Sequence, residues 1–136
     1  MIKPIVKMEF LLNTPSEEAT AADLEAAQDL LDTLAAYRSS CVGMAGNMIG
    51  VRKRIIVFTD GNRDRLMLNP QIIKGFQPYE TEEGCLSLTG VRPTKRFKKI
   101  TVRYQDTAFQ WHEEQFSGYP AQIIQHEIDH CNGILI

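Results

Sequence analysis

The stretch Gln125-His126-Glu127-Ile128-Asp129-His130, close to the end of the chain, contains two histidines four residues apart with a glutamate after the first. In an α-helix, residues four apart lie on the same face, so both imidazoles would point the same way. This spacing is typical of a divalent metal site with two histidine ligands, in which the carboxylate accepts a proton from a water molecule on the metal. The pattern is short, and its interpretation depends on a third ligand elsewhere in the chain.

We expect that third ligand upstream of the helix. Only six residues follow His130, and Cys131 would point about 100° away from the histidine pair around the helix. The upstream candidates are Cys41, Cys85, His112 and several carboxylates. Cys85 ranks first because it lies in Glu83-Gly84-Cys85-Leu86-Ser87, where a tight Gly-Cys step allows backbone amides to face a ligand as well.

Composition and charge predict one globular domain over residues 1–136. A chain of 136 residues buries roughly two-thirds of its unfolded surface, and 43% hydrophobic with 24% charged residues is typical of globular proteins. The net charge of -2 gives no reason to expect nucleic acid or an anionic membrane as the main partner. No apolar run approaches the roughly 20 residues of a membrane helix. Three cysteines form no disulfide framework, which favours a reducing cytoplasm.

The pattern of apolar residues predicts an α+β fold with two main helices. Residues 1–13 are expected to form an extended arm over the core. Thr20 and Asp23 resemble a capping box, and an apolar stripe of helical period follows, so a packing helix is predicted over about 20–38. Pro120 and Asn132-Gly133 are typical of the first turn and the end of a helix. They predict a nearly buried helix over about 120–131 that carries the histidines.

The strands are expected to be short and mostly antiparallel. The apolar and β-branched runs predict strands at 54–59, 66–68, 72–73, 79–83 and 101–105, with a hairpin strand at 109–116. The segment 41–50 is rich in glycine and small residues, which allow a close approach of the backbone to a strand or a ligand. It lacks the Lys-Ser/Thr pair of a phosphate-binding loop.

Most other polar residues are interpreted as structural. We expect His112 to be a solvated surface residue, and Cys41 and Cys131 to be unpaired packing residues. The acids of the cluster 80–83 other than Glu83, which is nearest to Cys85, are assigned to solvent. An arginine shortly after Cys85, Arg92 or Arg96, is expected either to orient Asp129 or to meet a substrate carboxylate.

In chain order, the segments 41–50, 83–87 and 125–130 resemble three motifs of the peptide deformylases. Those enzymes carry Gly-x-Gly-x-Ala-Ala-x-Gln, then Glu-Gly-Cys-Leu-Ser, then Gln-His-Glu-x-Asp-His, and the last two are intact here. His126 follows Cys85 by 41 residues, roughly the gap found in the family. The resemblance covers essentially the whole chain. It implies a peptide-deformylase-like fold of mostly antiparallel strands around the helix that binds the metal.

The resemblance also implies a function and its residues. The activity would be metal-dependent removal of the N-formyl group from the N-terminal methionine of newly made polypeptides, by a cytoplasmic monomer with the ribosome as a further partner. The metal would be ferrous iron in the cell, replaceable by zinc, nickel or cobalt. The implied ligands are Cys85, His126 and His130; the general base and acid is Glu127; the Leu86 amide helps hold the oxyanion; and Val42, Gly43 and Gly84 line the peptide groove.

The first motif departs from the family pattern at three positions. Cys41 replaces the leading glycine, Gly46 replaces the second alanine, and Met48 replaces the glutamine. In the family, that glutamine donates a hydrogen bond to the developing oxyanion, whereas a thioether has no donor. Losing one such donor typically lowers the rate by about 10²–10³, on the order of 3–4 kcal/mol.

Three interpretations are therefore open. The first is a working deformylase, with reduced activity because of Met48. The second is a metal-binding relative that has lost catalysis and keeps a binding or regulatory role. The third is a different metal hydrolase that acts on another small amide, with Met48 reshaping its pocket.

Overall fold

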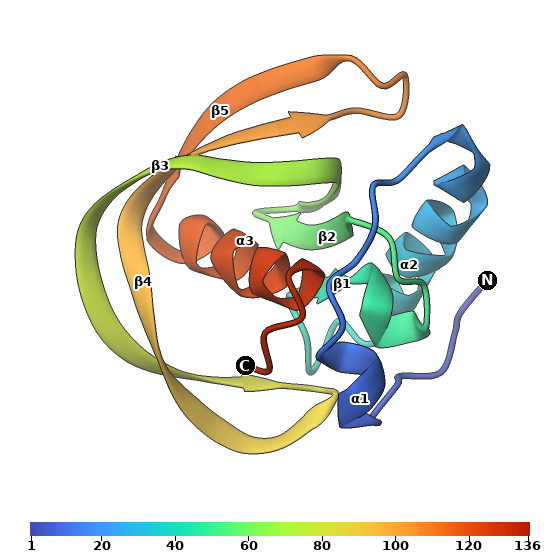
Figure 1. Ribbon diagram of the computed structural model, residues 1–136, viewed down its shortest axis with the longest axis horizontal. Coiled ribbons are helices and arrows are strands. Elements are labelled where there is room, and N and C mark those ends of the chain that lie inside the picture. The colour runs from blue at the N-terminus through green and yellow to red at the C-terminus, as the bar shows by residue number, and fades with distance from the viewer.

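The computed structural model describes residues 1–136. Its framework is one antiparallel sheet, against which the helices pack (Figure 1). Its five strands lie in chain order, β1-β2-β3-β4-β5. The predicted α+β class with mostly antiparallel strands is confirmed. The helices are α1 (Glu9–Leu12), α2 (Leu24–Ala36) and α3 (Gly118–Cys131), the 3₁₀ turns are η1 (Ala21–Asp23) and η2 (Gly46–Ile49), and the strands are β1 (Gly43–Ala45), β2 (Ile55–Asp60), β3 (Arg63–Cys85), β4 (Leu88–Gln105) and β5 (Trp111–Ser117).

Strand β2 is apolar along most of its length because helices cover both faces of the sheet there. Ile56 and Phe58 point into the cluster that packs around α3, whereas Ile55 and Val57 point into the cluster that packs against α2. Alternate residues of a strand face opposite sides, so a strand buried on both sides needs a continuous apolar run. The predicted strand at 54–59 is confirmed.

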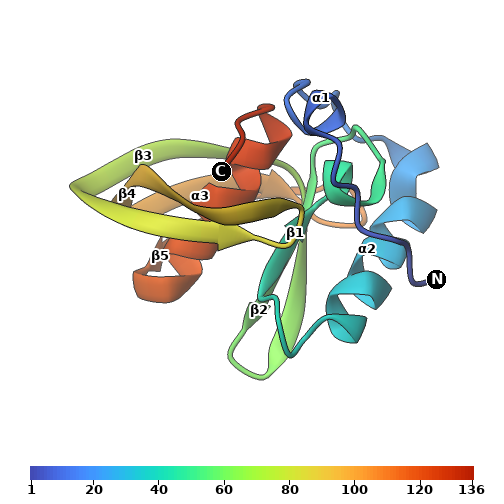
Figure 2. The ribbon, with the colours of Figure 1, turned by 90° about the horizontal axis from the view of Figure 1, so that it is seen from below.

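The strands β3 and β4 form a long, curved ribbon around α3, which Figures 1 and 2 show from two sides. The prediction of three short strands at 66–68, 72–73 and 79–83 is wrong, because they are parts of the single 23-residue strand β3. The strand predicted at 101–105 likewise begins as far back as Leu88. Register shifts after Leu68 and Ile72 interrupt the pairing of β3 with β4. Such bulges bend and twist a strand, which lets the ribbon wrap round the helix.

The predicted helices are found with small changes at their ends. The carboxylate of Asp23 accepts a hydrogen bond from the backbone N–H of Thr20 at 2.8 Å, and the helical segment then runs through η1 and α2. Helix α3 ends where the N–H of Gly133 bonds to the His130 carbonyl at 3.0 Å and the N–H of Ile134 bonds to the Asp129 carbonyl at 2.9 Å. Gly133 has φ +75°, the left-handed conformation that this type of helix end requires.

The N-terminal arm is only partly extended. Glu9–Leu12 form the short helix α1, and Leu12 is fully buried, so the expectation of an extended segment over 1–13 is wrong for its last turn. A buried leucine fixes this end of the arm to the body of the molecule.

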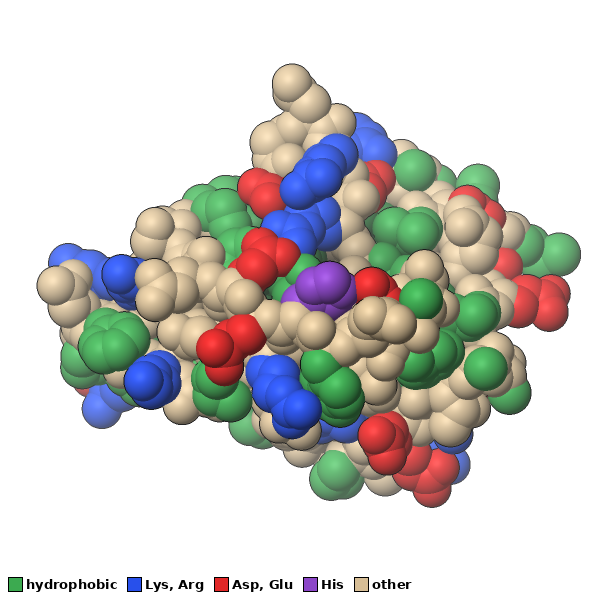
Figure 3. All heavy atoms as spheres, turned by 90° about the horizontal axis from the view of Figure 1, so that it is seen from above, with side chains coloured by type: hydrophobic (Ala, Val, Ile, Leu, Met, Phe, Trp, Pro, Cys, Tyr) green, Lys and Arg blue, Asp and Glu red, His purple; other side chains and the backbone are tan.

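No helix in the chain combines the length and the apolar character needed to cross a bilayer. Basic and acidic side chains are intermixed over the face shown in Figure 3, in keeping with the net charge of -2.

Candidate metal centre

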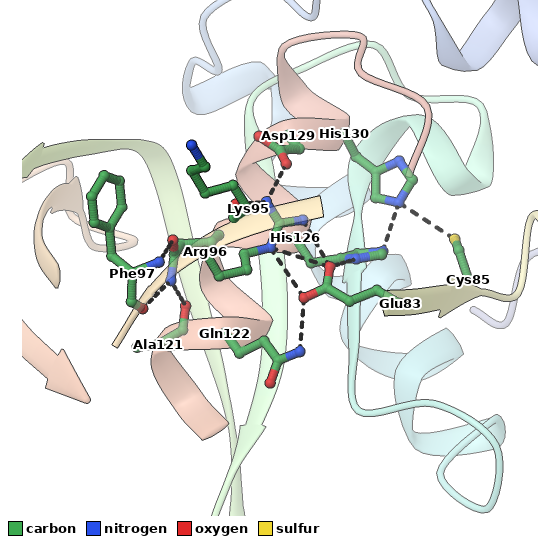
Figure 4. Close-up of polar contacts among 11 residues, drawn as sticks. Glu83, Cys85, Lys95, Arg96, Phe97, Ala121, Gln122, His126, Asp129 and His130 are labelled. Atoms are coloured by element: carbon green, nitrogen blue, oxygen red, sulfur yellow. Dashed lines mark hydrogen bonds and ion pairs between the residues drawn. The ribbon is translucent and has the colours of Figure 1, made fainter. Parts of the chain in front are cut away.

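Three donor atoms converge where the end of β3 meets the inner face of α3. Sγ of Cys85 lies 3.4 Å from Nε2 of His130, which lies 3.1 Å from Nε2 of His126 (Figure 4). All three donor atoms are within 4.8 Å of one another. The two histidines lie one helical turn apart on α3, and β3 contributes the thiol from 41 residues upstream. Cys41 and His112, the other upstream candidates considered for the third ligand, are not members of this cluster.

The spacing and chemistry of these atoms fit a divalent cation. In a tetrahedral site with ordinary metal–nitrogen and metal–sulfur bonds, neighbouring donor atoms lie about 3.3–3.6 Å apart. Two imidazole nitrogens at 3.1 Å would repel each other if both presented lone pairs with nothing between them. Two imidazoles and one thiolate form a donor set that suits zinc, iron and other first-row ions.

Glu83 fixes the orientation of the first histidine. Its Oε1 lies 2.8 Å from Nδ1 of His126, so the ring carries its proton on Nδ1 and turns Nε2 toward Cys85 and His130. Burial acts to raise the pKa of Glu83, but hydrogen bonds from His126, Arg96 and Gln122 outweigh it and hold the pKa at about 2. Glu83 is therefore a carboxylate at neutral pH.

Arg96 joins Glu83 to helix α3. Its Nη2 lies 2.7 Å from Oε1 of Glu83, and its Nη1 lies 2.7 Å from Oδ2 of Asp129. Only 4% of its side chain is exposed. The expected pairing of Arg96 with Asp129 is confirmed, whereas the contact with Glu83 was not predicted. No signal of spacing could have found it, because the strand register places Arg92, not Arg96, opposite Glu83.

When no ion is present, the pKa values of the two histidines are shifted in opposite directions. Burial lowers the pKa of His126, but the hydrogen bonds to Cys85 and Glu83 outweigh that effect and raise it to about 10. For His130, burial together with the charge on His126 lowers the pKa to about 3. His130 is thus a neutral ring.

Glu127 is buried beside these ligands and has one oxygen without a hydrogen-bond partner. Its side chain is 4% exposed, and Oε1 is fully enclosed. Burial raises the pKa of Glu127 to about 7. A carboxyl group with this pKa can both accept and release a proton near neutral pH.

A cleft of about 720 Å³ opens over this cluster. Val42 and Gly43, at the start of β1, line the cleft together with Gly84 and Leu86, which flank Cys85 at the end of β3. The predicted peptide-groove residues Val42, Gly43 and Gly84 all line this cleft, as do Met48, Leu86 and Glu127.

Met48 lines the cleft, but its side chain turns toward the backbone of Ala45. Its side chain is 1% exposed, and Sδ accepts a hydrogen bond from the N–H of Ala45 at 3.5 Å. The thioether therefore contributes an acceptor to the turn η2 and no donor to the cleft.

His112 and Cys131 have the structural roles expected of them, whereas Cys41 also lines the cleft. His112 is exposed and lies 2.7 Å from the carboxylate of Asp106, and Cys131 is buried in the core. Cys41 is unpaired, but it also lines the cleft, and its thiol donates to the carbonyl of Gly43 at 2.8 Å. Burial raises the pKa of Cys41 to about 12, so it remains a thiol.

Comparisons with known proteins agree with this geometry. The polypeptide deformylase family model matches residues 2–136. A peptide deformylase of Clostridium beijerinckii is 56% identical over 136 residues and is covered completely, as is this chain. A peptide deformylase of Thermotoga neapolitana is 34% identical over 135 residues, which cover 98% of this chain and 79% of that protein.

Solved structures show the same fold. The crystal structure of peptide deformylase from Thermotoga maritima superimposes with a TM-score of 0.89 at 30% identity, covering 99% of this chain and 95% of that one. A class I type b peptide deformylase from Acinetobacter baumannii with Met-Ala-Ser bound gives a TM-score of 0.88 at 27% identity, covering 99% and 97%. The chain therefore belongs to the polypeptide deformylase family, metallohydrolases that remove the formyl group from the N-terminal methionine of newly made polypeptides.

Proposed function

We propose that this chain hydrolyses the formyl amide of N-formylmethionyl peptides at the site formed by Cys85, His126 and His130. The observation that carries the proposal is the convergence of one thiol and two imidazole nitrogens beside a buried, unpaired carboxylate oxygen. A divalent ion held by these three residues would polarise the formyl oxygen and lower the pKa of the attacking water. We propose Fe²⁺ as the ion in the cell, with Zn²⁺, Ni²⁺ or Co²⁺ as substitutes, because all of them accept mixed thiolate and imidazole ligands.

Glu127 moves the proton in this proposal. Its carboxylate takes a proton from the attacking water as oxygen bonds to the formyl carbon, and it then gives that proton to the departing amine nitrogen. The C–N bond breaks, and formate and a free N-terminus are released. Burial raises the pKa of Glu127 to about 7, which suits both the uptake of the proton from water and its release to the amine.

The cleft residues would bind the peptide and the developing charge. Val42, Gly43 and Gly84 form walls against which an extended peptide can lie, and we assign the Leu86 amide to the oxyanion. Because Met48 has no donor and its Sδ is bonded to Ala45, the oxyanion receives one hydrogen bond fewer than in relatives with glutamine. We infer that the activity is reduced for this reason.

We further propose that the protein works as a cytoplasmic monomer on chains supplied by the ribosome. The three cysteines are free thiols, and a cysteine ligand has to stay reduced to bind a metal ion.

The test is formate release from a formylmethionyl tripeptide by nickel-loaded protein, compared among the parent, Glu127→Ala and Met48→Gln. We expect Glu127→Ala to lower the rate by about 10²–10⁴ and Met48→Gln to raise it by up to about 10²–10³. A metal-loaded parent that releases no formate would contradict the proposal, whether or not the Met48→Gln variant is active.

A second candidate function follows from Met48 alone. If the loaded parent is inactive and Met48→Gln restores formate release, the chain is a metal-binding relative that binds formylated peptides without turning them over. The hydrogen bond from the Ala45 N–H to Sδ of Met48 favours this alternative, because it fixes the thioether at the edge of the cleft.

A further inference from the structure

Two buried polar atoms near the metal centre lack a hydrogen-bond partner and lie on residues that touch each other. They are Nδ1 of His130 and Oδ1 of Asn47. Asn47 belongs to η2 and is 1% exposed, and His130 is fully buried. The other atom of the Asn47 amide, Nδ2, donates to the backbone carbonyl of His130 at 2.9 Å and lies 3.4 Å from the carbonyl of Leu12.

The two unpaired atoms are chemically complementary once His130 binds a metal. A neutral imidazole that offers the Nε2 lone pair to a cation carries its proton on Nδ1, so Nδ1 becomes a hydrogen-bond donor. Oδ1 of Asn47 is a carbonyl oxygen with two lone pairs and accepts only. Burying either atom without a partner is unfavourable, and pairing them removes both penalties.

Glu83 and Asp129 are already paired with other groups, and Glu127 is assigned to proton transfer in the proposed function. Glu83 accepts a hydrogen bond from Nδ1–H of His126 and further hydrogen bonds from Arg96 and Gln122. Asp129 is bonded to Arg96. A histidine that binds metal nearly always donates the N–H of its second ring nitrogen to an acceptor. Asn47 supplies an unpaired acceptor on a residue that already contacts His130.

We propose that Asn47 is the positioning residue for His130. Its Oδ1 accepts the hydrogen bond from Nδ1–H, directly or through one buried water, while Nδ2 holds the backbone carbonyl of the same histidine. Each histidine of the centre then has its own partner: a carboxylate, Glu83, for His126 and a neutral amide, Asn47, for His130. This inference rests on the proposed metal site.

Two substitutions separate the acceptor from the donor. Asn47→Asp keeps an oxygen that can accept from Nδ1–H but loses both amide donor bonds, and Asn47→Leu loses acceptor and donor together at similar size. The readout is Zn²⁺ affinity, measured by competition with a chelator, with circular dichroism to establish the folded fraction. We expect Asn47→Leu to bind Zn²⁺ about 10–100-fold more weakly and Asn47→Asp to bind it about as tightly as the parent.

The control is Asn69→Leu. Asn69 is similarly buried, at 3%, and its amide pairs with the backbone of Ala19 through Oδ1 at 2.7 Å and Nδ2 at 3.1 Å. It lies outside the cleft and the ligand cluster. Its loss should lower stability and leave Zn²⁺ affinity unchanged.

The outcomes separate this inference from the proposed function. A parent that binds no Zn²⁺ contradicts the metal site and this inference with it. A parent that binds Zn²⁺ normally, with Asn47→Leu equally tight or with Asn47→Asp as weak as Asn47→Leu, contradicts only the role of Asn47.

A measurement on the unmodified protein removes any dependence on folding of the variants. In Zn²⁺-loaded protein with ¹⁵N-labelled histidine, Nδ1 of His130 should be protonated and its proton should exchange slowly with solvent. Exchange as fast as that of the exposed His112 ring would overturn the proposal.

Discussion

Gly43 lies against the carboxylate of Glu127 so closely that its missing side chain is part of the site. A Cβ at this position would be 2.8 Å from Oε2 of Glu127 and 2.7 Å from Cγ2 of Ile123. Contacts this short require the neighbouring side chains to move. Ile123 and Glu127 are both buried and both contacts are too short, so the carboxylate has to shift together with Ile123.

We therefore expect Gly43→Ala to lower formate release by about 10²-fold while metal content stays at the parent level, because a displacement of about 1 Å at a catalytic group has an effect of this size. Gly84→Ala, at another glycine that lines the cleft, is the matched comparison. Its nearest contacts would be ordinary ones of 3.5 and 3.7 Å, so its effect should be much smaller. Equal rates for the two variants would show that the position of Glu127 does not depend on Gly43.

The proposed metal ligands could be predicted because motifs name them, and Arg96 was expected only as a candidate partner of Asp129. Cys85, His126 and His130 stand in two intact motifs, and the structure brings them together. Arg96 and Asn47 have no such marker. Arg96 reaches Glu83 across the strand register, and the amide of Asn47 meets His130 across 83 residues of sequence. Contacts of this kind arise from tertiary packing, which local spacing does not encode.

At the scale of elements, Gln125 attaches α3 to the ribbon. Its Oε1 accepts from the N–H of Phe97 at 2.8 Å, and its Nε2 donates to the Phe97 carbonyl at 2.9 Å. The side chain thus satisfies the backbone of β4 as a neighbouring strand would, and it is 4% exposed. This fixes the helix that carries both histidines against the inner side of the curve (Figure 1).

Replacing Gln125 by methionine keeps the volume but leaves the Phe97 backbone groups unpaired. Each buried group without a partner costs about 1–3 kcal/mol, so we expect the free energy of unfolding to fall by about 2–4 kcal/mol. Urea denaturation measures this change. Gln115→Met, at an exposed position of β5, is the control and should stay within about 0.5 kcal/mol of the parent. Equal free energies of unfolding for the two variants would show that Gln125 does not attach α3 to β4.

The helices could be predicted better than the strands, for a physical reason. A cap and an apolar stripe mark α2 locally, and the Asn132-Gly133 step marks the end of α3. The middle of β3 contains Pro78 and a polar run, which locally favours a loop. It is a strand because β4 pairs with it over most of its length, and the open edge of the ribbon tolerates a proline.

For the whole molecule, the ribbon explains how residues far apart in sequence form one site. Strand β3 leaves the central sheet beside β2, curves round α3 and ends with Cys85 next to the histidines (Figures 1 and 2). The α+β class could be predicted from periodicity, but the curvature of the ribbon could not, because it depends on bulges and on packing against α3. The metal centre thus depends on the entire fold, not on the motif helix alone.

The most direct test of the central claim is the metal content of the folded protein, measured by elemental analysis of the parent and of Cys85→Ser. We expect one divalent ion per chain in the parent and a largely metal-free Cys85→Ser variant with unchanged circular dichroism. One ion per chain retained at full occupancy in folded Cys85→Ser would contradict it, because the sulfur at the end of β3 would then not be a ligand.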